Sequence, residues 1–172
     1  MILNARQKHI MRTLANTHSA LQTQLSDRFG SKITTSLIEM GFIETRKVAF
    51  GELGNKYVCT LTTKGADHAR AYLCGGNGLY KGSGLQLEHD IKLAEKYLSL
   101  KKDERLTWLH ENALKKYYKN PDLKIDGAYW PSGKIGVGDI VGVESISRNY
   151  SRELIAEKQS QCEQNFNSWE FI

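Results

Sequence analysis

The sequence has little that would anchor a chain in a membrane or cross-link it. In its 172 residues no apolar run approaches the roughly 20 residues of a membrane-spanning helix. No basic and apolar leader opens it either, so we expect a cytoplasmic protein without membrane contacts. Its three cysteines, Cys59, Cys74 and Cys162, form no Cys-X-X-Cys pair and are odd in number. A disulfide framework and a zinc site are therefore not expected, and we interpret these cysteines as small buried residues.

Positive charge is present, and it is unevenly distributed. The net charge is +5. Residues 1–73 hold ten Lys plus Arg against five Asp plus Glu, whereas the remainder holds fourteen of each. Lysine and arginine neutralise phosphates, so this asymmetry favours a phosphate-bearing partner for the N-terminal half. The alternative, that these charged faces are merely solvated, stays open.

Residues 21–65 carry the most informative pattern. Apolar residues recur every four positions across residues 21–29 and predict a short helix that ends at Gly30. Residues 31–40 predict a second helix with Ser31 as its N-terminal cap. The outer face of this second helix is small, polar and partly basic, which suits docking in the DNA major groove.

A predicted hairpin follows these two helices. Residues 42–48 and 57–61 predict its strands, and the glycine-rich residues 51–56 predict its tip. Thr62 or Thr63 would cap a closing helix. This order of elements resembles the winged helix-turn-helix domains of many bacterial proteins, which implies a DNA-binding head at residues 1–74. The residues expected to contact DNA are Lys32, Thr34, Thr35, Ser36, Arg46, Lys47 and Lys56.

The composition changes abruptly after residue 74. Five glycines lie between Gly75 and Gly84, which predicts a linker at residues 75–84 and a second module at residues 85–172. Within residues 103–120 a strand at 106–109 and a helix continuing to Tyr118 both remain open, because periodicity does not separate them. The other elements expected in this module are a helix at 85–100, strands at 123–125, 127–130 and 135–146, and a helix at 149–166. An α+β fold is therefore expected for the whole chain.

Two acidic residues of the second module lie where they could converge. Asp126 precedes one strand of a predicted hairpin, and Glu144 lies in the next strand, so both side chains can meet at one edge of a sheet. Two such carboxylates can hold Mg²⁺, which polarises a phosphodiester and activates water. The alternative is that Asp126 and Gly127 merely start a turn and that Glu144 lies on an exposed strand face.

The segments LEHDIKLAEKYL, WLHENALKK, KIDGAYWPSGK and VGVESISRNYSRELIAEK resemble the PD-(D/E)XK restriction-endonuclease-like fold. More narrowly, the whole chain is similar to plasmid replication-relaxation and mobilisation proteins. The resemblance implies that Asp126 and Glu144 are catalytic and metal-binding and that Glu111 is an accessory acid. The chain departs from the family at Ile146, where a lysine is expected two positions after the second acid. The other cations that could supply positive charge are Lys134, Arg148, Arg152 and Lys158.

Three functions follow from these patterns. The first is a DNA-binding protein of a bacterial or phage mobile element, acting in replication, mobilisation or transcription control. Its expected partners are double-stranded DNA, a second copy of itself and a protein of the replication or mobilisation machinery. Because of Ile146, its second module is expected to position or sense rather than to cut. The second function is a Mg²⁺-dependent DNA nickase or endonuclease using Asp126 and Glu144, and the third is a protein-binding adaptor or inhibitor.

Overall fold

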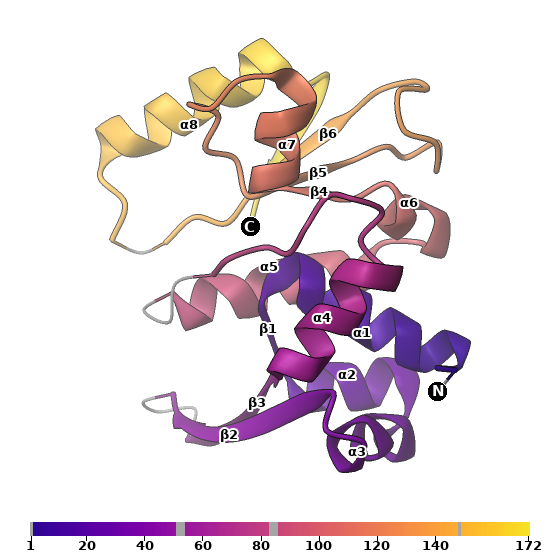
Figure 1. Cartoon of the computed structure of the whole chain (residues 1–172). Helices are drawn as coiled ribbons and strands as arrows, with labels where there is room; N and C mark the ends of the chain where they lie inside the picture. The colour runs from indigo at the N-terminus through magenta and orange to yellow at the C-terminus, as the bar shows by residue number, and fades with distance from the viewer. Residues whose placement is uncertain (1, 51–53, 83–85, 148) are drawn as a thin grey trace. The chain divides into compact units, whose positions relative to one another are not determined.

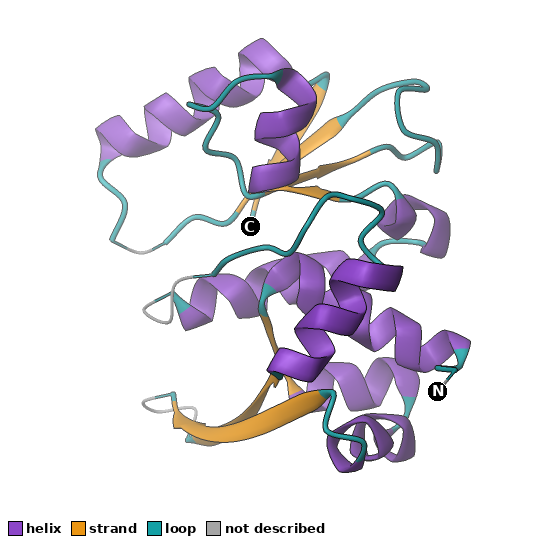
Figure 2. Cartoon of the chain, viewed as in Figure 1, coloured by secondary structure: helices purple, strands orange, loops and turns teal. Residues whose placement is uncertain are grey.

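The structure is a computed structural model that describes residues 2–50, 54–82, 86–147 and 149–172. It is a mixed α+β protein, which confirms the expected fold class (Figures 1 and 2). Among the residues so described, none of the helices combines the length and the apolar character that crossing a membrane requires. Three expected features fall outside the described residues: the hairpin tip at 51–53, the end of the linker at 83–84, and Arg148.

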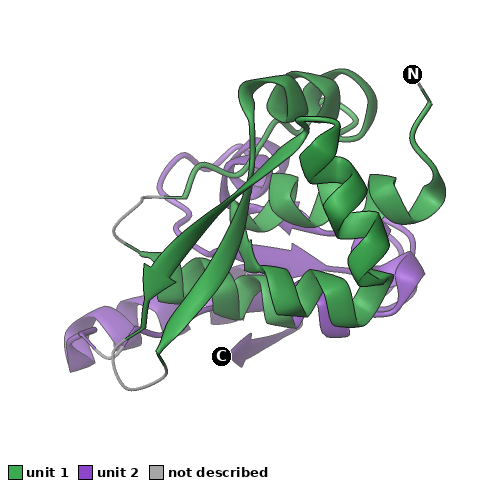
Figure 3. Ribbon diagram, turned by 90° about the horizontal axis from the view of Figure 1, so that it is seen from below, with its two compact units in different colours: residues 1–95 green, residues 96–172 purple. Residues whose placement is uncertain are grey.

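The chain divides into two compact units, residues 1–95 and 96–172 (Figure 3). This division falls inside helix α5 (Leu87–Ser99) and differs from the boundary expected at residues 75–84. A backbone contact explains why the glycine-rich segment stays with the first unit. The N–H group of Tyr80 donates to the carbonyl oxygen of Ala15 at 2.8 Å.

The first unit combines helices with a three-stranded antiparallel sheet in the order β1-β3-β2. The two central helices and the hairpin lie close to their predicted positions. Strand β1 was not predicted, because three residues are too few to reveal an alternating pattern. The elements are α1 (Ala5–Thr17), β1 (Ser19–Leu21), α2 (Gln22–Phe29), α3 (Ser31–Glu39), β2 (Ile43–Ala49), β3 (Asn55–Leu61) and α4 (Thr63–Tyr72).

Specific residues mark the ends of helices α2, α3 and α4. Gly30 separates α2 from α3 with a φ of 98°, a conformation that favours glycine. The prediction that Ser31 caps α3 is wrong, because Ser31 is the first helical residue and no side chain caps this helix. Thr62 does cap α4: its hydroxyl accepts from the N–H group of Gly65 at 3.1 Å and donates to the carbonyl oxygen of Gly41 at 2.7 Å. This threonine therefore ties the turn after α3 to the start of α4.

The second unit is built on a four-stranded sheet in the order β4-β5-β6-β7. Strand β5 is antiparallel to both neighbours, whereas β6 and β7 are parallel and are connected through α8. The segment left open between strand and helix contains both, as β4 and α7. The elements are α6 (Lys102–Leu106), β4 (Leu109–His110), α7 (Glu111–Tyr118), β5 (Gly127–Tyr129), β6 (Val141–Glu144), α8 (Arg152–Asn165) and β7 (Ser168–Phe171).

Two strand predictions for this unit are wrong. Residues 123–125 form no strand, although Leu123 and Ile125 are buried. The strand expected from residue 135 starts only at Val141, because the preceding segment contains glycines with φ values of 74° and 76°. Positive φ is incompatible with an extended strand. Residues 131–140 are therefore a loop rather than a tight hairpin turn.

Helices α7 and α8 share a buried apolar cluster with the sheet. Leu114 of α7 and Cys162 of α8 belong to the same cluster as Ala128 of β5. The approach of α8 and the residues that follow it is close. A Cβ atom on Gly142 of β6 would meet the ring of Phe166 at 2.5 Å. This packing holds α8 against the sheet and fixes which of its side chains face the strand ends.

Candidate functional site

The two acids singled out in the sequence come together at one end of strands β5 and β6. The strand register pairs Gly127 with Val143, which places Asp126 and Glu144 side by side. The N–H group of Asp126 donates to Oε2 of Glu144 at 3.2 Å, and the N–H group of Ser145 donates to Oδ2 of Asp126 at 2.8 Å. Glu144 does not lie on an exposed face, because its side chain is 0% exposed.

A lysine from α8 completes this cluster. Nζ of Lys158 lies 2.6 Å from Oε1 of Glu144 and also donates to the carbonyl oxygen of Lys124. The Lys158 side chain is 10% exposed. Of the other candidate cations among the described residues, Lys134 and Arg152 are exposed. Lys158 is thus the candidate cation that the described structure places against these acids. We call Asp126, Glu144 and Lys158 the acid–lysine centre.

The protonation behaviour of the centre follows from its burial. Burial, and then the charge of Asp126, raise the pKa of Glu144 to about 8, while Lys158 opposes this shift. Burial lowers the pKa of Lys158, but the neighbouring carboxylates of Glu144 and Asp126 outweigh it, and the net shift is upward. The lysine is therefore held in its charged form, while burial and the nearby Asp126 favour the protonated form of Glu144.

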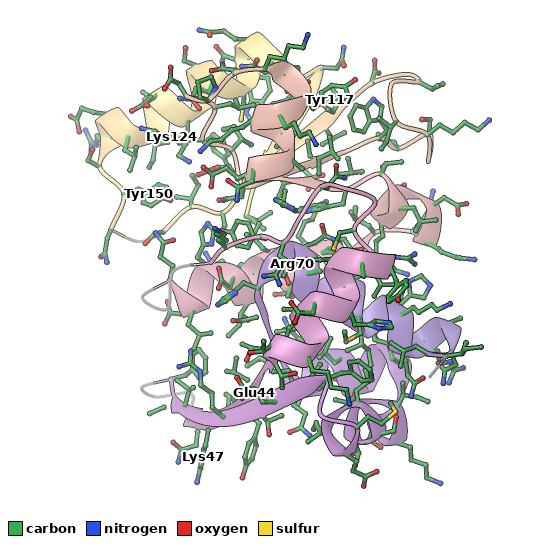
Figure 4. The ribbon with its side chains drawn as sticks, viewed as in Figure 1. Glu44, Lys47, Arg70, Tyr117, Lys124 and Tyr150 are labelled. Carbon is green, nitrogen blue, oxygen red and sulfur yellow. The ribbon has the colours of Figure 1, made fainter. Side chains whose placement is uncertain are left out.

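Two other residues border the centre. Tyr150 lies in the segment between β6 and α8 (Figure 4). Its pKa is raised by burial and then by the charge of Glu144, with smaller effects from Asp126 and Glu111 and an opposing effect of Lys158. The charges of the centre thus influence the ionisation of the Tyr150 phenol group.

Glu111 is next to the centre through its backbone. Its N–H group donates to the carbonyl oxygen of Asp126 at 3.1 Å, while its carboxylate pairs with Lys115 at 2.6 Å. An accessory role for the Glu111 side chain would have to compete with this ion pair. Ile146, at the position of the expected lysine, continues the sheet: its N–H group donates to the carbonyl oxygen of Ile172 at 2.9 Å.

The donor groups of the centre fit Mg²⁺. Asp126 and Glu144 offer carboxylate oxygens, and Mg²⁺ is usually held by one or two carboxylates together with water and phosphate oxygens. A cation would also relieve the repulsion that helps to raise the pKa of Glu144. Across the described residues there is no group of three or more His, Cys, Asp or Glu side chains that could hold a metal. The described centre thus offers two carboxylates to a metal, and the oxygens of Glu144 already pair with Lys158 and with the N–H group of Asp126.

The sequence pointed to Lys158 through its place on the buried face of α8, and not through its distance from Glu144 in the sequence. Lys158 lies one helical turn before the buried Cys162, on the inward stripe of α8. A charged side chain is rarely buried unless it is paired. A lysine on an inward stripe therefore predicts an acidic partner.

Four exposed cations of the first unit lie on the β2–β3 hairpin and on α3, and others lie on α1, α2 and α4. Arg46, Lys47 and Lys56 are exposed on the hairpin, and Lys47 extends away from it in Figure 4. Lys32 and Thr35 are exposed on α3. Within the described part of the chain no ion pair involves any of these cations. The same elements also carry two exposed acids, Glu39 on α3 and Glu44 on β2.

Two residues expected to contact DNA face inward instead. Thr34 is fully buried, since it lies one turn before the buried Leu37, and this removes it from the expected contact surface. The hydroxyl of Ser36 accepts from Nε2 of Gln7 at 3.1 Å and donates to the carbonyl oxygen of Ile33 at 2.9 Å. Ser36 therefore joins α3 to α1, and the polar face of α3 is narrower than the sequence pattern suggested.

Comparison with protein-family models, with curated proteins and with solved structures gave no match. The function is therefore inferred from the chemistry of the acid–lysine centre and of the basic surface.

Proposed function

We propose that the chain binds duplex DNA through its first unit and hydrolyses a phosphodiester bond at the acid–lysine centre of its second. The observation that carries this proposal is the ammonium group of Lys158, 2.6 Å from Glu144, which in turn is bonded to Asp126. The expectation that the second unit does not cut rested on Ile146. Lys158 supplies from α8 the charge that position 146 lacks.

The sheet of the second unit supports a restriction-endonuclease-like arrangement. Its order is β4-β5-β6-β7 with β5 antiparallel to its neighbours, and a helix connects the parallel strands β6 and β7. The two acids lie just before β5 and at the end of β6, at one edge of the sheet. The pairing of Gly127 with Val143, which sets the two acids side by side, supports this arrangement.

Each member of the centre has a separate role. Asp126 and Glu144 would hold Mg²⁺, which supplies a Lewis acid and an activated water for phosphodiester hydrolysis. Lys158 stabilises the negative charge that develops on the phosphate or on the attacking oxygen. The backbone N–H groups of Asp126 and Ser145 fix the orientation of the two carboxylates. Glu111 would contribute only after release from Lys115.

The first unit would bind DNA as a winged helix-turn-helix. In this arrangement α3 enters the major groove with Lys32 and Thr35, and the hairpin reaches phosphates with Arg46, Lys47 and Lys56. No described acid forms an ion pair with these cations, which supports the proposal, because phosphate neutralisation needs cations that are free to meet phosphates. A role in a mobile element, a second copy on DNA and a protein partner in replication or mobilisation follow from the family resemblance alone.

Cleavage is tested by incubating the full chain with supercoiled plasmid and Mg²⁺ and measuring nicked and linear DNA. We expect Asp126→Asn, Glu144→Gln and Lys158→Met each to lower the rate at least about 100-fold. Arg152→Gln, on the exposed side of the helix that carries Lys158, is the matched control and should retain activity. Nicking that survives all three site variants would refute the proposal. A wild-type chain that binds duplex DNA without cutting it would favour the non-cutting function.

DNA binding is tested by measuring duplex affinity against salt concentration. Arg46→Gln and Lys47→Gln should each weaken binding and reduce the slope of log K against log salt by about 0.9. The control is Arg70→Gln, an exposed arginine of α4 already paired with Asp67 at 2.8 Å. Affinity that does not depend on salt, or that is the same in all three variants, would point to the adaptor function.

A further inference from the structure

A hollow lies on the first unit between α1 and α4, away from the hairpin cations. Its volume is about 550 Å³. Lys8 and Arg12 lie one turn apart on α1, and His68 and Tyr72 lie one turn apart on α4, so the two pairs form facing walls. The residues that line the hollow are Ile2, Leu3, Lys8, Arg12, His68, Tyr72 and Leu73.

Two of the apolar or aromatic residues that line the hollow are open to solvent, whereas Leu3 is 3% exposed. Ile2 is 94% exposed and Tyr72 is 74% exposed. The ring of His68 lies 4.9 Å from that of Tyr72, so two adjacent rings form the α4 wall. Large apolar groups that stay exposed next to a hollow mark a surface on which a ligand can bury them.

The charged part of the lining is positive only. None of the described residues that line the hollow is acidic, and no ion pair among them or their described neighbours involves Lys8 or Arg12. Asp67, on the same helix as His68, pairs with Arg70 at 2.8 Å. The hollow thus combines two uncompensated cations with an aromatic and aliphatic wall.

We propose that this hollow binds a small organic anion with a flat apolar body. The anionic group lies at Lys8 and Arg12, where charge-assisted hydrogen bonds are available. The apolar body covers Tyr72 and Leu73. A volume of about 550 Å³ falls within the roughly 300 to 1,000 Å³ of small-molecule sites. This site does not depend on DNA binding or on the acid–lysine centre.

A ligand that has both an anionic group and an apolar body fits this hollow better than a ligand that has only one of the two. Inorganic phosphate would use the cations but would leave Ile2 and Tyr72 in water. A neutral hydrocarbon would cover the wall but would not pair with Lys8 and Arg12. An anion with an aromatic body should therefore bind more tightly than either.

The test is a fluorescence titration of the full chain with 1-anilinonaphthalene-8-sulfonate, which carries a sulfonate on an aromatic body. We expect saturable binding that Lys8→Gln and Arg12→Gln each weaken about fivefold, since partly exposed charge pairs contribute up to roughly 1 kcal/mol. Tyr72→Ser should also weaken it, and circular dichroism checks that the variant is folded. The matched control is Arg6→Gln, an exposed cation of the same helix outside the hollow, which should bind as the wild type does.

The neutral analogue N-phenyl-1-naphthylamine and inorganic phosphate complete the test. The neutral analogue should bind at least about fivefold more weakly than the sulfonate, and phosphate should compete only weakly. Equal affinity for the two aromatic probes would overturn the role of the cations. Equal effects of the Arg12 and Arg6 substitutions would place the probe elsewhere on the chain and overturn the proposed site.

Discussion

Replacing Lys158 with methionine isolates the contribution of the ammonium group to the acid–lysine centre. Methionine is a flexible, unbranched side chain of similar length, so the apolar stem is largely retained while the charge is lost. Glu144, whose side chain is 0% exposed, then stays buried beside Asp126 without its ion pair. Removing one partner of a buried pair costs about 3 to 5 kcal/mol. The pH dependence of this cost is more diagnostic than its size.

The sign of that dependence follows from the pKa of Glu144. Burial and Asp126 raise it from 4.5 to about 8 in the wild type, so this group stabilises the fold fully below about pH 4.5, and the stabilisation is lost as the pH rises through about 8. Lys158 lowers the pKa of Glu144, and its removal must move that pKa above 8. Above about pH 8 the wild type therefore stops losing stability from this group, whereas Lys158→Met continues to lose it. One extra bound proton widens the difference in unfolding free energy by about 1.4 kcal/mol per pH unit.

The tryptophans give an assay confined to the second unit. Trp108, Trp130 and Trp169 are all the tryptophans of the chain, and all lie within residues 96–172. Urea unfolding followed by tryptophan fluorescence, from about pH 6 to about pH 9.5, gives the unfolding free energies of wild type and variant. The double variant Lys158→Met with Glu144→Gln has no titratable carboxyl group at position 144. Its difference from the wild type in unfolding free energy should therefore not increase in this way. If the difference in unfolding free energy between wild type and Lys158→Met stays constant above about pH 8, the assignment of a buried Glu144 paired with lysine is refuted.

Three further predictions concern packing, capping and thiol chemistry. Gly127→Ala would place a Cβ atom 2.2 Å from the ring of Trp108, so it should lower the urea midpoint of tryptophan fluorescence by an amount equivalent to about 1 to 3 kcal/mol; an unchanged midpoint would contradict this close packing. Thr62→Ala should cost the first unit about 1 kcal/mol by removing the cap of α4, measured by circular dichroism, with Thr63→Ala as a control of little effect. Burial raises the pKa of Cys59 and Cys162 to about 12, so both should resist iodoacetamide in the folded chain, and mass spectrometry showing rapid alkylation of either would contradict their burial.

The first unit was largely predictable because its apolar residues repeat with the helical period. Spacing of that kind reports the buried face of a helix, and α2 and α3 accordingly lie close to the predicted ranges. It does not report the rotation of the helix to within one residue. Thr34 is buried while Ile33 is only partly so, although the hydroxyl of Thr34 has no hydrogen-bond partner among the described residues. The predicted set of DNA-contacting residues therefore included Thr34, which the structure buries.

The strands of the second unit were less predictable, because their pattern depends on backbone conformation. Ile135 and Val137 alternate with glycines and imitate a strand, yet they are 49% and 52% exposed in a loop. The glycines between them adopt positive φ, which a pattern of side-chain polarity cannot reveal. Strand β7 was missed for a different reason. Its partner β6 lies on the far side of α8 in the chain, so its pairing is entirely non-local.

The same non-local geometry brings a lysine to the acids although position 146 holds isoleucine. A residue two positions after Glu144 shares its face of the strand, and a lysine there would reach the acids directly. The chain instead passes through α8, and the packing of that helix on the sheet brings Lys158 to Glu144. The proposed chemistry requires an ammonium group close to the two acids, whichever sequence position supplies it. Replacing both members of a buried ion pair by apolar side chains is often neutral or stabilising, so stability alone gives little reason for the pair of Lys158 and Glu144. Its presence is therefore better explained by a use at this centre than by stability, and the proposed hydrolysis depends on Lys158 more than on any feature of the first unit.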